Sequence, residues 1–197
     1  MRGAGKIAGL AAGLVLATVL ALAPAGGAAN GDQRVSLTKL EISAWTKAGE
    51  RRRSIHVLVL KGTDLDNSLS LSYDEATDEL VFTSEFTFAP PLPEGCSSAD
   101  PPQEIHTVRC VRGVFDALEV NFLGGPDVVE MERGMSLPAT VRAGEGADVV
   151  TTAAADDLVQ GGPGNDTIST SRGRDVIRGG PGRDKINDGP GKDSVRP

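Results

Sequence analysis

The chain has 197 residues, a length that allows one domain or two small ones. Its 27 acidic residues outnumber its 20 lysines and arginines, which gives a formal net charge of −7 at pH 7. This balance argues against nucleic acid and anionic membrane surfaces as partners, and it mildly favours cations.

The first 29 residues have the pattern of a secretory signal peptide. A short basic start is followed by an unbroken apolar run at 7–22 and by small residues that suit cleavage after Ala25 or Ala29. A single membrane anchor is the alternative, but the run is shorter than the roughly 20 residues that span a bilayer. We therefore expect a secreted, extracellular protein with no membrane span after cleavage. Removing Arg2 and Lys6 leaves 18 basic against 27 acidic residues, a net charge of −9.

Cys96 and Cys110 are the only two cysteines of the sequence. In an exported protein they predict one disulfide, which would fasten the loop expected between them at 97–109. Two free thiols are the alternative.

Composition divides the chain near Leu123. All seven aromatic residues lie before this position, whereas 11 of the last 55 residues are glycine, well above the average of about 7%. We expect a β-rich N-terminal region at 30–122 and a different region at 123–197. The alternative is that the boundary separates two styles of one continuous sheet.

The N-terminal region is predicted to be all-β. Five segments are short, rich in β-branched or aromatic residues and partly alternating: 35–43, 55–60, 68–73, 79–88 and 114–123. Leu69, Leu71 and Tyr73 share one face of their segment, and the turn at 74–77 predicts a hairpin with the segment that follows. No helical period of useful length follows the signal segment.

The C-terminal region is a nine-residue repeat. Six units run from Ala143 to Arg196: AGEGADVVT, TAAADDLVQ, GGPGNDTIS, TSRGRDVIR, GGPGRDKIN and DGPGKDSVR. The sixth position is always aspartate, the eighth is always Val or Ile, and the fourth is glycine in all units but the second, which has Ala155. Three positions that keep the same register over 54 residues establish a true repeat.

One buried aliphatic per nine residues is too sparse for a helix face or for an ordinary sandwich strand. It suits a strand of about three residues followed by a turn of about six, with two units forming one coil of a flattened helix. Glycine in the turns permits positive φ and close approach between coils. Stacking then places the aspartates in two columns, each joining units n and n+2. The first column is Asp148, Asp166 and Asp184, and the second is Asp157, Asp175 and Asp193.

Carboxylates stacked one coil apart repel one another, and glycine-rich turns lose much entropy on ordering. A hard cation that prefers six to eight oxygen ligands offsets both costs by binding carboxylates together with backbone carbonyls. The aspartates are therefore predicted to be calcium ligands.

The unit resembles the nonapeptide of the RTX (repeats-in-toxin, haemolysin-type) calcium-binding family, G-G-x-G-x-D-x-U-x, where U is a large apolar residue. GGPGNDTIS and GGPGRDKIN match every fixed position, and TAAADDLVQ lacks all three glycines. The resemblance is firm over 143–197 and reaches weakly back to LGGPDVVEM, where Asp127 and Val129 look like a shortened unit. It implies a right-handed parallel β-roll with calcium between units n and n+2. The N-terminal part is similar in style to the front of small secreted actinobacterial proteins of this kind.

The resemblance implies about two to four Ca²⁺ ions. The best-matched sites lie between 161–166 and 179–184 and between 143–148 and 161–166, followed by 170–175 with 188–193. The site that uses Asp157 matches least well. The implied carbonyl ligands lie near Gly144, Gly146, Gly161, Gly162, Gly164, Gly173, Gly179, Gly180, Gly182, Gly189 and Gly191.

Basic residues inside the units offer an alternative to metal. They could pair with the carboxylates and make some turns purely structural: Arg172, Arg174, Arg178, Arg183, Lys185 and Lys192. The segment 62–67 carries Asp64 and Asp66, which indicate an acidic turn more than a further ion site.

Three classes of function remain from the sequence. A non-catalytic secreted calcium-binding protein is the main hypothesis. An envelope-associated adhesion module, with the roll as a spacer for a protein or cell-surface partner, is the second. An enzyme with a calcium-binding tail is the third, and His56 and His106, the only histidines, fit strands better than a catalytic site.

Overall fold

All secondary-structure elements of the described residues are β-strands, so the prediction of an all-β protein is confirmed. The computed structural model describes residues 34–44 and 53–197, and the predicted signal peptide lies outside them. The strands are β1 (Val35–Ala44), β2 (Arg53–Lys61), β3 (Ser68–Asp74), β4 (Glu79–Ser84), β5 (Phe88–Ala89), β6 (Cys96–Ser97), β7 (Thr107–Val111), β8 (Ala117–Asn121), β9 (Val128–Met131), β10 (Ala139–Arg142), β11 (Val149–Thr151), β12 (Leu158–Gln160), β13 (Thr167–Ser169), β14 (Val176–Arg178), β15 (Lys185–Asn187) and β16 (Ser194–Arg196).

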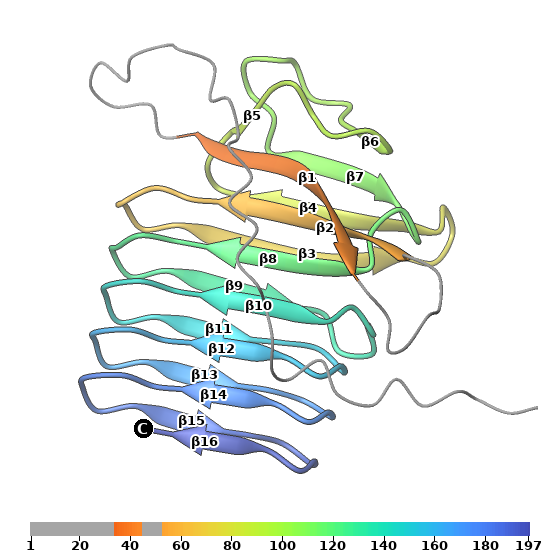
Figure 1. Ribbon diagram of the computed structural model, residues 1–197. Helices are drawn as coiled ribbons and strands as arrows, with labels where there is room; N and C mark the ends of the chain where they lie inside the picture. The colour runs from red at the N-terminus through yellow and green to blue at the C-terminus, as the bar shows by residue number, and fades with distance from the viewer. Residues whose placement is uncertain (1–33, 45–52) are drawn as a thin grey trace, which may run out of the picture. The chain divides into compact units, whose positions relative to one another are not determined.

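The strands form two eight-stranded sheets. Sheet A has the order β16-β14-β12-β10-β8-β2-β1-β5, and sheet B has the order β15-β13-β11-β9-β3-β4-β7-β6. From β8 onward the chain alternates between the sheets, and from β10 onward each strand pairs in parallel with the strand two places earlier. Figure 1 shows these strands stacked in chain order down to the C-terminus. The parallel β-roll is therefore confirmed.

The aliphatic eighth position of each unit forms the interior of the roll. Val150 pairs with Ile168, and Ile168 with Ile186, while Val159 and Ile177 pair in the other sheet. The side chains of Val150, Val159, Ile168 and Ile177 are at most 1% exposed. In the last coil of the structure, which has a neighbouring coil on one side only, Ile186 is half-buried and Val195 is 39% exposed.

The segment before the roll forms an antiparallel cap, residues 34–44 and 53–111. In it β1 pairs with β2, and β3, β4 and β7 pair in succession, which confirms the predicted hairpin of β3 and β4. The strands β2 and β3 also pair in parallel with β8 and β9, so both sheets run across residue 123 without interruption. One hydrophobic core, with Leu58, Phe82 and Val141, extends through cap and roll.

Two details of the cap differ from the expected strands. The segment 79–88 is not one strand, because the chain turns after Ser84, whose hydroxyl accepts the N–H of Phe86. Phe88 then pairs with Val35 of the other sheet. In addition, the segment between the cysteines contains the strand β7 rather than only a loop. The disulfide between Cys96 and Cys110 is present and joins β6 to β7.

Candidate metal centre

The turns of the roll lie along two edges of the sheets. Turns from sheet A to sheet B form the first edge, and each has six residues: 62–67, 122–127, 143–148, 161–166 and 179–184. Turns from sheet B to sheet A form the second edge: 132–138, 152–157, 170–175 and 188–193. The aspartate of every unit ends its turn, directly before a strand.

Glycine at the second position of the turn is required by the backbone. Gly144, Gly162 and Gly180 have φ of 112°, 117° and 116°, which L side chains rarely adopt. A Cβ on Gly162 would lie 1.9 Å from the carbonyl oxygen of Gly144 in the preceding coil. The backbones of successive coils therefore approach so closely that only glycine fits.

The first column of aspartates is linked by hydrogen bonds from coil to coil. The N–H of Asp148 donates to Oδ1 of Asp166 over 3.0 Å, and the N–H of Asp166 donates to Oδ1 of Asp184 over 3.1 Å. The column also has two earlier members, since Asp127 N–H donates to Asp148 and Asn67 N–H donates to Asp127. Each carboxylate thus reaches back to the turn of the preceding coil.

The second column has the same arrangement. The N–H of Asp157 donates to Oδ1 of Asp175 over 3.0 Å, and that of Asp175 donates to Asp193 over 2.9 Å. Asp157 itself accepts from the N–H of Ala139. The predicted division of the six aspartates into two columns corresponds to these contacts.

The other carboxylate oxygen of the buried aspartates has no partner. Oδ2 is buried without a hydrogen bond in Asp127, Asp148, Asp157, Asp166 and Asp175. These side chains are at most 3% exposed. An ionised carboxylate buried in this way is costly unless a positive charge accompanies it. Burial accordingly raises the pKa of Asp148, Asp166 and Asp175, and raises the pKa of Asp127 and of Asp157 to about 6.

The basic residues of the repeat do not supply that charge. Arg174 pairs with Asp156, an exposed fifth-position residue, with Nη2 and Oδ2 2.8 Å apart. The backbone N–H of Arg183 donates to the side chain of Asn165. Among the described residues no lysine, arginine or histidine forms an ion pair with an aspartate of either column.

The glycine carbonyls divide into two groups. Those of Gly161 and Gly179 accept the N–H of Gly144 and Gly162, and so they already link successive coils. In the described backbone, the carbonyls of four second- and fourth-position glycines accept no such hydrogen bond: Gly144, Gly146, Gly162 and Gly164. These carbonyls are the free backbone oxygens beside the first column.

The oxygen atoms available as metal ligands fit a hard cation better than a soft one. Unpartnered carboxylate oxygens and free carbonyls are ligands that Ca²⁺ prefers. No group of three or more His, Cys, Asp or Glu side chains that could hold a metal occurs within 34–44 and 53–197. A cation between coils would therefore depend on backbone carbonyls and water as well as on carboxylates.

A family model described as the RTX calcium-binding nonapeptide repeat (4 copies) matches residues 140–168 and 169–196. The C-terminal region of this chain consists of RTX calcium-binding repeats. RTX repeats bind calcium, in agreement with the donors described above. No match was found among curated proteins or among solved structures.

Two members of the first column lie outside the RTX repeats. The turn 122–127 has the six residues of an RTX turn, so its interpretation as a shortened unit is wrong. Asp127 stands 21 residues before Asp148 rather than 18, because the intervening strands and turn are longer. The sequence did not lead us to expect Asn67 as a member of the first column. Its segment 62–70 nevertheless has glycine at the first position, a polar residue at the sixth and Leu69 at the eighth.

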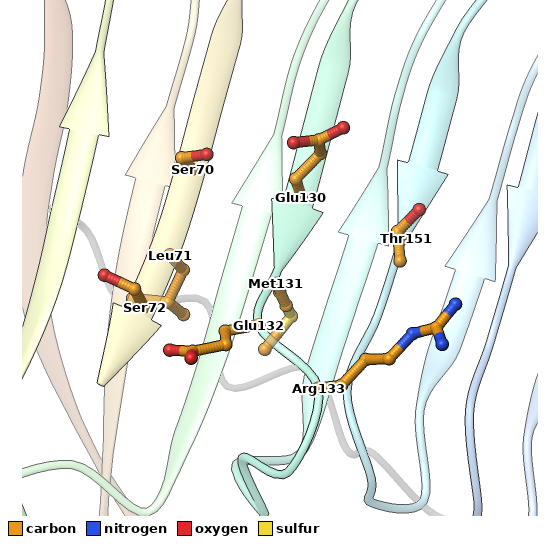
Figure 2. A pocket seen from close by; sticks show the side chains of 8 residues that line it. All are labelled: Ser70, Leu71, Ser72, Glu130, Met131, Glu132, Arg133 and Thr151. Atoms are coloured by element: carbon orange, nitrogen blue, oxygen red, sulfur yellow. The ribbon is translucent and has the colours of Figure 1, made fainter. Parts of the chain in front are cut away.

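Two hollows lie away from the columns. One, of about 310 Å³, lies on sheet B, where Figure 2 shows Ser70 and Glu130 projecting from β3 and β9. The other, of about 550 Å³, is lined by residues that include Tyr73, Arg112 and Met135. His56 lies in β2, 3.9 Å from Asp116, and His106 Nδ1 lies 3.2 Å from the carbonyl of Ser84; neither histidine is among the residues that line these two hollows.

Proposed function

We propose that this protein is a secreted, non-catalytic calcium-binding protein whose RTX repeats become ordered around Ca²⁺. The ions would lie between the turns of units n and n+2, about two to four per chain. The side-chain ligands would be Asp148, Asp166, Asp184, Asp157, Asp175 and Asp193. The observation that carries the proposal is the row of buried, unpartnered Oδ2 atoms along both edges.

Calcium would act on the stability of the roll. Without the ion, buried carboxylates one coil apart repel one another, and they have no described basic partner. Ca²⁺ would neutralise them and link successive turns, so binding free energy would appear as folding free energy. Millimolar calcium outside the cell suits the affinities of extracellular modules, with Kd about 10⁻⁴–10⁻³ M. The signal-like segment at 1–29 supports this location.

The first edge is expected to bind more tightly than the second. Position one of its repeat turns is Ala143, Gly161 or Gly179, and a Cβ on Gly161 would lie only 2.2 Å from Oδ2 of Asp166. On the second edge, position one is Thr152, Thr170 or Asp188. Thr152 and Thr170 lie beside the carboxylates of Asp157 and Asp175, in space that an ion or its water would need.

The test is far-UV circular dichroism of the mature protein during calcium titration, with magnesium as the ionic control. We expect a cooperative gain of β signal that is lost in the variant Asp166→Ala/Asp184→Ala. The matched control is Glu75→Ala/Glu85→Ala, which removes two exposed carboxylates of the cap and should respond as the wild type does. A wild-type spectrum indifferent to both calcium and chelator would refute the proposal.

The two other functional classes lack a specific observation in their favour. An adhesion module would be favoured by an exposed aromatic patch, but the aromatic side chains among the described residues are buried or half-buried. Trp45 lies outside these residues. The part of the chain that the structure describes also contains no helix long and apolar enough to cross a membrane.

A further inference from the structure

The turns 62–67 and 122–127 stack at the junction of cap and roll in the way that two RTX turns do. Asn67 occupies the place of the repeat aspartate in the upper turn, and Asp127 occupies it in the lower turn. The backbone N–H of Asn67 donates to Oδ1 of Asp127 over 2.6 Å, and its Nδ2 donates to the same atom over 2.8 Å. Both turns lie outside residues 140–196, where the family model matches.

The side chain of Asn67 has no capacity left for the second oxygen of Asp127. Its Oδ1 accepts the N–H and the hydroxyl of Thr63, each over 3.2 Å. Its Nδ2 also donates to the carbonyls of Thr63 and Leu65. The side-chain amide of Asn67 therefore makes all of its hydrogen bonds within the turn 62–67 and to Oδ1 of Asp127. Oδ2 of Asp127 remains buried without a partner.

Asp127 is a buried carboxylate in a negative environment. Its side chain is 1% exposed, and no described basic residue forms an ion pair with it. Its Oδ2 is buried without a hydrogen bond, and the neighbouring side chains of Asp148 and Asp66 are also acidic. A carboxylate buried in this way is costly unless a positive charge accompanies it.

Asp66 is placed to share a cation with Asp127. Gly125 has φ of 92°, and a Cβ on it would lie 3.0 Å from Oδ1 of Asp66. The carboxylate of Asp66 is thus held against the lower turn by this close packing. It is exposed and accepts no hydrogen bond from another described residue, so its oxygens are free for a ligand.

The geometry points to a divalent-cation site at the junction, with Asp127 Oδ2 and the carboxylate of Asp66 as ligands and water completing the shell. It is additional to the sites between the RTX repeats. A cation here links the cap to the first coil of the roll, so that the cap gains stability from calcium although it contains no RTX repeat.

The test is the number of Ca²⁺ ions bound per chain, measured by native mass spectrometry and by isothermal titration calorimetry on the full mature protein. Asp127→Asn should bind one ion fewer than the wild type. Asp66→Asn should weaken the same ion by about tenfold or more, the range seen when a supporting group of a metal site is removed. Asp64→Asn, an exposed carboxylate two residues away with the same change of charge, should bind as the wild type does.

The outcomes separate this site from those of the repeats. A full ion count in folded Asp127→Asn would overturn the inference while leaving the proposed function intact. Equal weakening by Asp64→Asn and Asp66→Asn would also overturn it, because only net charge would then matter. An ion that persists in Asp166→Ala/Asp184→Ala and is lost in Asp127→Asn would support it independently of the repeats. If Asp127→Asn does not fold, the comparison of Asp66→Asn with Asp64→Asn decides.

Discussion

The backbone N–H of Asp148 donates a hydrogen bond to Oδ1 of Asp166, 18 residues later, across 3.0 Å. This bond leaves Oδ2 of Asp166 buried and unpartnered, and the same relationship recurs at Asp127, Asp148, Asp157 and Asp175. One oxygen of each aspartate therefore fixes the spacing of the coils, and the other is left for a ligand. The structural role of the aspartate and its proposed metal-binding role are thus combined in one side chain.

The fourth-position glycines should not tolerate a methyl group. A Cβ on Gly164 would lie 1.5 Å from the carbonyl oxygen of Gly146, so Gly164→Ala must push two coils apart. We expect a loss of about 1–3 kcal/mol in the free energy of unfolding, as for overpacking in a tight interior. Urea denaturation in saturating calcium measures it. In the control Gly124→Ala, the nearest atom lies 3.4 Å away, and a loss of equal size would contradict this explanation.

Calcium-free protein should become less stable as the pH rises from about 4 to about 6. The pKa values of Asp127 and Asp157 are raised to about 6 in the folded protein from 3.8, chiefly by burial. The folded state therefore holds protons that the unfolded chain has lost, and this stabilisation disappears as pH rises through the folded pKa. Asp100 has a lowered pKa, because it accepts the N–H of Thr107, and it contributes the opposite slope only below about pH 4.

Thermal unfolding in metal-depleted buffers between pH 4 and pH 7 measures this effect. Excess calcium at pH 7 should restore the stability, since the ion replaces the proton. A metal-free melting temperature that rises steadily from pH 4 to pH 6 would contradict the assignment of buried, unneutralised carboxylates.

Removing the exposed ion pair of the repeat should not change calcium binding. Arg174 and Asp156 are both about half-exposed, with side chains 51% and 53% accessible. Such pairs contribute about 0.2–1 kcal/mol. We therefore expect Arg174→Gln to lower stability slightly and to leave the number of bound ions unchanged by calorimetry. A marked gain of calcium affinity would instead show that Arg174 competes with the ion for the second column.

The disulfide should stabilise the cap without controlling the response to calcium. It closes a loop between residues 14 apart in sequence, and Cys110 is fully buried. The variant Cys96→Ala/Cys110→Ala should lose about 2–4 kcal/mol of stability. The calcium-dependent change in circular dichroism should persist, because the RTX turns remain intact. Loss of that change in a variant with a folded cap would show that the cap governs the metal sites.

Much of the roll could be predicted from sequence because its signal is periodic. Aspartate at the sixth position and Val or Ile at the eighth mark the end of each turn and the strand that follows, and their spacing predicts the pairing of Ile168 with Ile186. Asp127 was weakly recognised because 21 residues, rather than 18, separate it from Asp148, which moves it out of the nonapeptide register. Asn67 lacks a carboxylate and lies in a segment whose partners are distant in sequence.

The cap was less predictable because its pairings are set by tertiary contacts. The segment 79–88 has one alternating pattern, yet the turn after Ser84 moves Phe88 to the other sheet. The strand β7 is flanked by a proline-rich segment and contains Cys110, so its short pattern was hidden within an expected loop. Neither departure involves the columns, which is why the candidate site was recognised more completely than the fold around it.

The most direct test of the central claim is amide hydrogen exchange of the mature protein, followed by mass spectrometry, with and without calcium. The account predicts that calcium slows exchange strongly in peptides from 143–196, most of all around Asp148 and Asp166, whose N–H groups donate to the next aspartate. Exchange in peptides from the antiparallel strands β4 and β7 of the cap should slow much less than exchange in the roll. Equal protection of 143–196 with calcium and with chelator would contradict the account, because the roll would then be held by packing and backbone hydrogen bonds alone.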